Sequence, residues 1–139
     1  MSRIASLAKL HATGNDFLAT EAALGAADAV ALCNRHTGVG ADGLLLLGPG
    51  RDGADATMTL YNADGGLAQM SGNGARCLAW VAHRAGLGTA DCLVVDTGGG
   101  RRALELTLDA SGEVAAATCD MGPVTFDPAS IPLHAPSAF

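Results

Sequence analysis

The stretch QMSGNGARC, residues 69–77, places a serine and two glycines directly before a long apolar run. We predict that this run forms a helix over residues 73–86, because its apolar residues cover most of a helical circumference. These residues are Ala75, Cys77, Leu78, Ala79, Trp80, Val81, Ala82 and Ala85. A helix that is apolar nearly all round is buried on nearly all sides, so another layer of structure must surround it.

The start of this helix has the features of an anion-binding pocket. The first turn of a helix carries unpaired backbone N–H groups and the positive end of the helix dipole. Gly72, Asn73 and Gly74 supply that turn here, and glycines let a ligand approach the backbone closely. Ser71 on its own is better explained by capping, in which its hydroxyl accepts an N–H bond and contributes about 1 kcal/mol.

The remainder of the chain reads mostly as strands. Short apolar or alternating runs predict strands over residues 3–9, 16–20, 44–47, 56–62, 92–97, 102–109 and 114–122. The turn ASGE should join the last two strands as an antiparallel hairpin. In this hairpin we expect Leu104, Leu106 and Leu108 to share one face.

A second helix is predicted over residues 25–35. Helical spacing puts the following residues on one side of it: Ala27, Val30, Ala31 and Asn34. Two helices among a larger number of strands indicate the α+β class. We expect a curved, mostly antiparallel, barrel-like sheet wrapped around the central buried helix.

Composition argues against several classes of function. The chain has 139 residues, enough for one domain, and a net charge of −6 without any cluster of Lys or Arg. It therefore lacks the positive surface that a nucleic-acid partner requires, and we expect none. The longest apolar run, GLLLLG, is far shorter than the roughly 20 residues of a membrane span, so no membrane partner is expected.

The cysteines and histidines lack the spacing of a metal site. The four cysteines contain no C-x-x-C pair, and the four histidines contain no H-E-x-x-H pattern. We therefore expect no metal. Four cysteines are also too few for a disulfide framework in a chain of this length, which favours free buried thiols in a reducing cytoplasm.

The C-terminal residues differ from the rest in composition. Residues 123–139 contain four of the five prolines, which is typical of a linker. We expect residues 1–122 to form the folded lobe and residues 123–139 to be a Pro-rich exit segment.

Three polar loops surround the predicted helix end. HATGNDF (11–17), YNADGG (61–66) and SGNGARC (71–77) each read singly as a turn, and each contains an asparagine: Asn15, Asn62 and Asn73. Together they offer amide donors and acceptors to a small zwitterion. A fourth segment, GVGADG (38–43), matches a dinucleotide-binding pattern. It follows a helix and opens a strand, which reverses that motif's context, so it predicts only a glycine-rich turn.

The motifs HATGNDF, RHTGVGADGLLLL, YNADG and MSGNGARC, in this order and spacing, resemble the N-terminal half of diaminopimelate epimerase. The resemblance covers essentially the whole chain. It implies an isomerase that interconverts LL- and meso-diaminopimelate by two-base proton transfer, for lysine and peptidoglycan synthesis. It also implies that neither pyridoxal phosphate nor any other cofactor takes part. The family's fold has two similar lobes, each a barrel-like sheet around a central helix, with the substrate between them.

The resemblance also assigns residues to the site. It implies that Asn15 and Asn62 contact the substrate and that the backbone of Gly72 and Asn73 holds its α-carboxylate. The family's first catalytic residue is a cysteine immediately before G-N-G, and here that position is Ser71. Cys77 matches a second, non-catalytic position. A serine hydroxyl is far less acidic than a thiol and needs a neighbouring base, so we expect impaired proton abstraction.

The partner that the resemblance implies is a second lobe or subunit. The family's other catalytic cysteine belongs to a second lobe, and this chain ends at Phe139, about where the family crosses to it. Residues 1–139 alone are therefore expected to be inactive. Two alternatives stay open: a non-catalytic lobe that binds an amino acid or a partner protein, and a hydroxyproline dehydratase-like relative that tolerates a hydroxyl at position 71.

Overall fold

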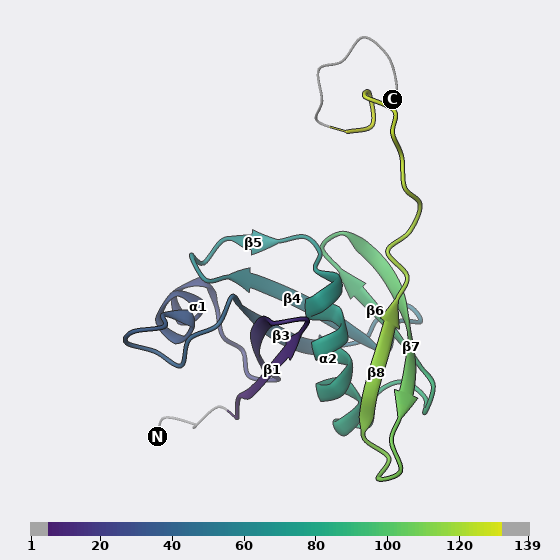
Figure 1. The fold of residues 1–139 in the computed structure, drawn as a ribbon, viewed down its shortest axis with the longest axis horizontal. Coiled ribbons are helices and arrows are strands. Elements are labelled where there is room, and N and C mark those ends of the chain that lie inside the picture. Colours follow the sequence, from purple (N-terminus) through teal and green to yellow (C-terminus); the bar gives the residue numbers. More distant parts are fainter. Residues whose placement is uncertain (1–5, 132–139) are drawn as a thin grey trace.

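The computed structural model describes residues 6–131, in which one sheet curves around a helix (Figure 1). In chain order the elements are β1 (Ala8–Ala12), β2 (Asn15–Thr20), α1 (Ala26–Cys33), β3 (Gly43–Pro49), β4 (Ala56–Asn62), β5 (Leu67–Ala68), α2 (Gly72–Arg84), β6 (Cys92–Thr97), β7 (Gly100–Leu108) and β8 (Val114–Cys119). The strand order in the sheet is β1-β2-β3-β4-β6-β7-β8, and β5 pairs with β4. The predicted α+β class and the curved sheet around a central helix are confirmed.

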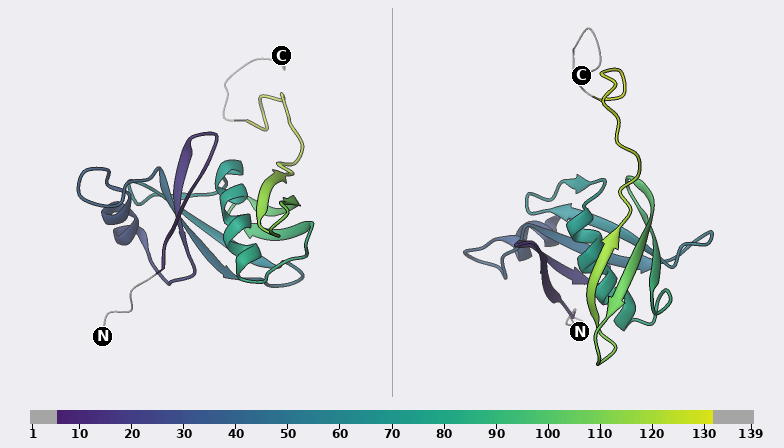
Figure 2. Two further views of the ribbon diagram at one scale, coloured as in Figure 1. Left: turned by 60° about the horizontal axis from the view of Figure 1, so that its bottom comes forward. Right: turned by 45° about the vertical axis from the view of Figure 1, so that its right-hand side comes forward.

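The two helices lie on opposite faces of the sheet, and each belongs to a connection between parallel strands. β2 pairs with β3 and β4 pairs with β6 in parallel, whereas the other neighbouring strands are antiparallel. Parallel strands need a long connection, which is usually helical. α1 lies in the first connection and packs outside the curve. α2 lies in the second and fills the inside of the curve, between β1 and β8 (Figure 2).

The leucine run of β3 is buried because both faces of this strand are covered. Leu45 and Leu47 belong to the main core around α2, and Leu44 packs with Leu18 in a smaller core under α1. Successive side chains of a strand point to opposite faces, so a strand covered on both sides is apolar without alternation. The predicted hairpin of β7 and β8 shows the other pattern, with Leu104 and Leu106 buried and their neighbours exposed.

Helix α2 is buried on most sides, as predicted. The expected range of 73–86 is observed as Gly72–Arg84, and Leu78, Ala79 and Ala82 are completely buried. A narrow stripe of α2 between β1 and β8 is only half-buried and contains Arg76 and Trp80. The sheet therefore forms most, but not all, of the cover that the apolar pattern requires.

Helix α1 forms close to its predicted range, but its buried face is not the one that the spacing suggested. It spans Ala26–Cys33 and buries Ala29 and Cys33. The following residues are exposed: Ala27, Val30, Ala31 and Asn34. In a short alanine-rich helix several faces are similarly apolar, so periodicity does not select the face that meets the sheet.

Two further differences concern strand ends. The first strand was expected over 3–9 and is observed at Ala8–Ala12, because a two-residue turn at Thr13 and Gly14 sets the register with β2. Residues 1–5 lie outside the described residues. β5, which contains only two residues, was not predicted.

The expected division into a lobe over 1–122 and an exit segment over 123–139 stays a prediction. Residues 120–131 contain neither helix nor strand, and residues 132–139 lie outside the described range. Across residues 6–131, the helices are too short or too polar to span a membrane.

Candidate active site at the first turn of helix α2

The first turn of α2 is capped by Ser71. The Ser71 hydroxyl accepts a hydrogen bond from the Gly74 N–H at 2.9 Å, and the Ser71 carbonyl accepts one from Ala75 at 2.8 Å. Among the residues described, the backbone N–H groups of Gly72 and Asn73 meet no acceptor. These two donors at the positive end of the helix are therefore left for a ligand.

This turn opens onto a hollow of about 450 Å³ between α2 and the end of β8. The hollow is lined by Ser71, Gly72, Asn73, Arg76, Ala117, Thr118, Cys119 and Met121. A Cβ atom added at Gly72 would lie 3.0 Å from the Met121 sulfur. A side chain at position 72 would therefore require Met121 to move or would fill part of this hollow.

A series of side-chain hydrogen bonds links this turn to the first residue of β2 and to the loop before β3. The Asn73 amide nitrogen donates to the Asn15 oxygen at 3.2 Å. The Asn15 amide nitrogen in turn donates to the Asp42 carboxylate at 2.7 Å. On the other side of Asn73, its oxygen accepts a hydrogen bond from the Arg76 guanidinium. Asn15 and Asn73, which are 58 positions apart, therefore meet directly, as their assignment to one site requires.

Asp42 is held from behind by charged residues. Arg35 donates to both oxygens of Asp16, at 2.7 and 3.0 Å, and to Asp42 at 3.0 Å. Lys9 lies 3.2 Å from Asp16. The hydrogen bonds from Arg35 hold the pKa of Asp16 well below its usual range. The same hydrogen bonds, together with the one that Arg35 donates to Asp42, raise the pKa of Arg35. Asp16 and Arg35 are thus both charged at physiological pH, and their contacts with Asp42 fix the start of β2 against the start of β3.

Asn62 lies at the end of β4, close to these hydrogen-bonded side chains but not bonded to them. Its partner across the sheet is Gly43, and the following Ala63 donates its N–H to the Asp42 carbonyl at 3.1 Å. The Asn62 side chain makes no hydrogen bond to another residue of the described range. The structure therefore brings Ser71, Gly72, Asn73 and Asn15 together by direct contact, and it brings Asn62 close only through the backbone.

The surroundings of the cysteines do not favour an acid–base role for them in this hollow. Burial raises the pKa of Cys77 to about 11, which agrees with its assignment to a non-catalytic position. All four cysteines are free; Cys33 is also buried, whereas Cys92 and Cys119 are half-buried, so only two match the expected buried thiols. In residues 6–131 no three His, Cys, Asp or Glu side chains gather as metal ligands would.

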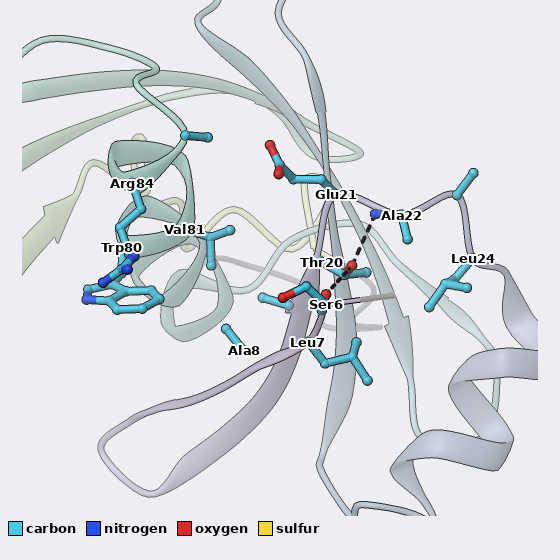
Figure 3. Close-up of a pocket in the computed structure, with 13 residues that line it drawn as sticks. Ser6, Leu7, Ala8, Thr20, Glu21, Ala22, Leu24, Trp80, Val81 and Arg84 are labelled. Carbon is cyan, nitrogen blue, oxygen red and sulfur yellow. Dashed lines mark hydrogen bonds between the residues drawn. The ribbon is translucent and has the colours of Figure 1, made fainter. Parts of the chain in front are cut away.

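A larger hollow lies elsewhere, at the other end of α2. It measures about 1000 Å³ and lies between the first part of β1, the end of β2 and the last turns of α2 (Figure 3). Figure 3 shows the Arg84 guanidinium beside the Trp80 ring, at 4.7 Å from its centroid. Small apolar side chains form much of the wall. The Thr20 hydroxyl donates a hydrogen bond to the Ser6 carbonyl and accepts one from the Ala22 N–H. None of the four motifs contributes a predicted site residue there.

Sequence reasoning missed three parts of the site. Arg76 and Asp42 lie within quoted motifs, yet nothing in the sequence indicates that they bond to Asn73 and Asn15. The end of β8 and the residues that follow it, which supply Cys119 and Met121 to the hollow, were assigned only to a hairpin. The signal that could have found Arg76 is its spacing of three residues from Asn73 on the predicted helix, which places the two side chains on one face.

The architecture is also found in solved structures. A hydroxyproline epimerase from Agrobacterium vitis superposes with a TM-score of 0.62, at 17% sequence identity, over 83% of this chain and 40% of its own. At that identity the likeness shows the fold alone. The chain therefore shares the fold of part of that protein.

The sequence comparisons are more specific, and the chain belongs to the diaminopimelate epimerase family. The model of the family described as diaminopimelate epimerase matches residues 7–126. The diaminopimelate epimerase of Caldanaerobacter subterraneus subsp. tengcongensis is 39% identical over 128 residues, which are 90% of this chain and 46% of the relative. That of Bacteroides thetaiotaomicron is 39% identical over 82% of this chain and 44% of the relative. The chain thus spans a little under half the length of these relatives.

Proposed function

We propose that this lobe forms one half of the active site of a diaminopimelate epimerase. In this proposal the protein interconverts LL- and meso-diaminopimelate by moving the proton on the α-carbon, with one acid–base group on each face of the substrate. Ser71 occupies the acid–base position on this lobe. A second lobe or subunit supplies the opposite group and the contacts to the far end of the substrate.

The observation that carries the proposal is the pair of free N–H donors at Gly72 and Asn73. Both residues line the hollow beside Ser71, and the helix dipole adds positive potential at the same point. A carboxylate bound there brings the α-carbon of an amino acid next to position 71. As the α-proton leaves, negative charge spreads toward that carboxylate, and oriented donors stabilise this charge more in the transition state than in the ground state.

Asn15, Asn73 and Asn62 complete the proposed contacts. Asn73 and Asn15 are locked together at 3.2 Å, so their free hydrogens form one rigid polar surface rather than two mobile groups. Asn62 is exposed at the end of β4, where its amide is available to a ligand that reaches beyond the hollow.

Ser71 in place of the family's cysteine has a chemical consequence. The Gly74 N–H that now bonds the hydroxyl would also stabilise a thiolate, because both present an electron pair to the same donor. A hydroxyl stays protonated near neutral pH and needs a neighbouring base to remove a proton from carbon. We therefore infer that the serine form has low activity and that a thiol at position 71 restores it.

Exposed apolar side chains support a partner on this side of the lobe. Met121, Val124 and Phe126 follow β8 where it leaves the sheet near the start of α2 (Figure 1), and all three are more than half exposed. Leu67 on β5 is 68% exposed. Such a group of apolar residues is typical of an interface. We further propose a cytoplasmic setting, which the four free cysteines support.

The test is solvent exchange of the α-proton of diaminopimelate in D₂O, followed by NMR. The chain is combined with the C-terminal part of the Caldanaerobacter relative, and co-elution establishes assembly. Serine, Ser71→Cys and Ser71→Ala forms are compared. We expect exchange to rise by orders of magnitude with Ser71→Cys and to be absent from the lobe alone. Equal exchange by the cysteine and alanine forms of an assembled complex would contradict the proposal.

A second candidate is a non-catalytic lobe that binds an amino acid or a protein. The observation that favours it is the capping bond, since the Ser71 hydroxyl is already used by Gly74 at 2.9 Å. In that case Ser71→Cys only weakens the cap, by about 1 kcal/mol, and creates no exchange. The hydroxyproline-type alternative has less support, because the Agrobacterium protein is 17% identical and the Caldanaerobacter relative 39%.

A further inference from the structure

We propose that Arg76 and Asp42 are positioning residues that fix the orientation of the two site amides. The four side chains form a hydrogen-bonded series in the order Arg76, Asn73, Asn15 and Asp42. Arg76 acts from one end of this series and Asp42 from the other. Their effect is to leave the free hydrogens of Asn73 and Asn15 as donors, which suits a carboxylate and disfavours an ammonium group. This inference rests on the proposed function, since it concerns how the same site recognises its substrate.

Arg76 defines the orientation of the Asn73 amide at one end of the series. A guanidinium group donates hydrogen bonds and cannot accept them. Arg76 donates to the Asn73 side-chain oxygen and, at 3.4 Å, from Nε to the Gly72 carbonyl. The oxygen of the Asn73 amide must therefore face Arg76, and its nitrogen must face Asn15. Both contacts fall within the first turn of α2, so Arg76 ties the Asn73 side chain to the same turn that carries the free N–H groups.

Asp42 defines the orientation of the Asn15 amide at the other end of the series. An ionised carboxylate accepts hydrogen bonds and cannot donate them. Asp42 accepts from the Asn15 nitrogen at 2.7 Å and from the Asp16 backbone N–H at 3.2 Å. The nitrogen of the Asn15 amide must face Asp42, so its oxygen must face Asn73. Arg35 holds the other Asp42 oxygen at 3.0 Å.

The two ends require the same arrangement in the middle. Seen from Arg76, Asn73 must donate to Asn15; seen from Asp42, Asn15 must accept from Asn73. The observed bond, from the Asn73 nitrogen to the Asn15 oxygen at 3.2 Å, satisfies both. A reversed amide at either position would put two donors or two acceptors in contact, and a buried polar group without a partner is costly. One donor-only and one acceptor-only residue thus define both amides.

Some hydrogens of the two amides are not used within this series and remain available to a ligand. Each amide nitrogen carries two hydrogens and uses one of them within the chain. The second hydrogen of each has no acceptor within residues 6–131, and the same is true of the backbone N–H groups of Gly72 and Asn73. Arg76 also lines the hollow and forms no ion pair with a carboxylate of residues 6–131. Donors and an unpaired positive charge together favour an anionic group over a cationic one.

The experiment uses the full chain labelled with ¹⁵N and two probes of equal length. One probe is meso-diaminopimelate; the other is 1,5-diaminopentane, which has the same carbon chain between the amines but no carboxylate. The variants are Arg76→Met, Arg76→Lys and Asp42→Asn. Arg84→Met is the matched control, since Arg84 lies on the same helix and pairs with Glu113 at 3.0 Å.

The first readout needs no ligand. We expect the Asn73 and Asn15 side-chain NH₂ groups to show widely separated hydrogen resonances and a mutual nuclear Overhauser effect. Arg76→Met and Asp42→Asn should collapse this pattern, whereas Arg76→Lys, which keeps a donor-only residue, and Arg84→Met should retain it. The same pattern in Arg76→Met and Asp42→Asn would overturn the inference. If one of these two variants fails to fold, the other gives the answer.

The second readout separates this inference from the proposed function. We expect diaminopimelate, and not diaminopentane, to shift the NH₂ signals of the starting chain. We also expect Arg76→Met to bind diaminopimelate about tenfold more weakly, because the charge-assisted hydrogen bond from Arg76 to the Asn73 oxygen is lost and Asn73 is no longer held in place. Absence of any diaminopimelate effect on the starting chain contradicts the proposed function, while the ligand-free pattern still tests the inference. Binding that is unchanged in Arg76→Met contradicts the inference alone.

Discussion

A thiol introduced by Ser71→Cys should be unusually acidic, and the structure gives the size of the effect. Position 71 caps a 13-residue helix and lies 2.9 Å from the Gly74 N–H. A charge at such a helix end is stabilised by roughly 0.3–2 kcal/mol. Because one pKa unit corresponds to about 1.4 kcal/mol, the thiol pKa should fall by about 0.2–1.5 units, from about 8.5 to about 7.0–8.3.

The assay is the rate of alkylation by iodoacetamide as a function of pH, resolved by mass spectrometry of peptides. Cys77 on the same helix is the internal control, because burial raises its pKa to about 11 and it should react slowly throughout. The introduced thiol should reach half of its maximal rate at a pH about 0.2–1.5 units below that of an unperturbed cysteine peptide. A midpoint at or above that of the peptide would refute the argument that this helix end favours an anion.

Three further predictions concern the scaffold of the site. Leu78→Ala in the completely buried core of α2 should lower the free energy of unfolding by about 2–5 kcal/mol, whereas Leu67→Ala at an exposed position should change it by less than about 0.5 kcal/mol in urea denaturation. Thr13 is β-branched with a φ of 55°, so Thr13→Asn should stabilise the chain by about 1 kcal/mol, measured the same way. The pKa of Asp16 is depressed by Arg35, so its contribution to stability is present above the unfolded pKa of about 3.9 and is lost as the pH falls through the lower folded value. Asp16→Asn should therefore lower the melting temperature at pH 7, and the difference from the unchanged chain should narrow only below about pH 4; a constant difference across this range would contradict the assignment.

The parts of the fold that the sequence predicted are those in which local pattern and tertiary environment agree. The alternation of Leu104 and Leu106 and the apolar circumference of α2 each reflect burial that is set by neighbours in the sheet. The buried face of α1 was not predictable, because Ala29 and Val30 are both apolar, and a periodic pattern records only whether a residue is apolar. Which of them meets the sheet depends on how α1 crosses β3.

The site shows the same division. Ser71, Gly72 and Asn73 are consecutive, so one helix start brings them together without any long-range contact. Contacts between Asn15 and Asp42, 27 positions apart, depend on the parallel pairing of β2 with β3. A sequence pattern contains no direct sign of that pairing, and Asp42 was therefore read only as part of a glycine-rich turn.

We propose that the first turn of α2 binds the carboxylate of an α-amino acid. The most direct test of this proposal is titration of the ¹⁵N-labelled chain with meso-diaminopimelate, observed at the backbone N–H groups. We predict that the largest shifts, in the direction of stronger hydrogen bonding, occur at Gly72 and Asn73, the donors that meet no acceptor within residues 6–131. Shifts confined to the hollow around Trp80 and Arg84, or none at millimolar ligand, would contradict the claim.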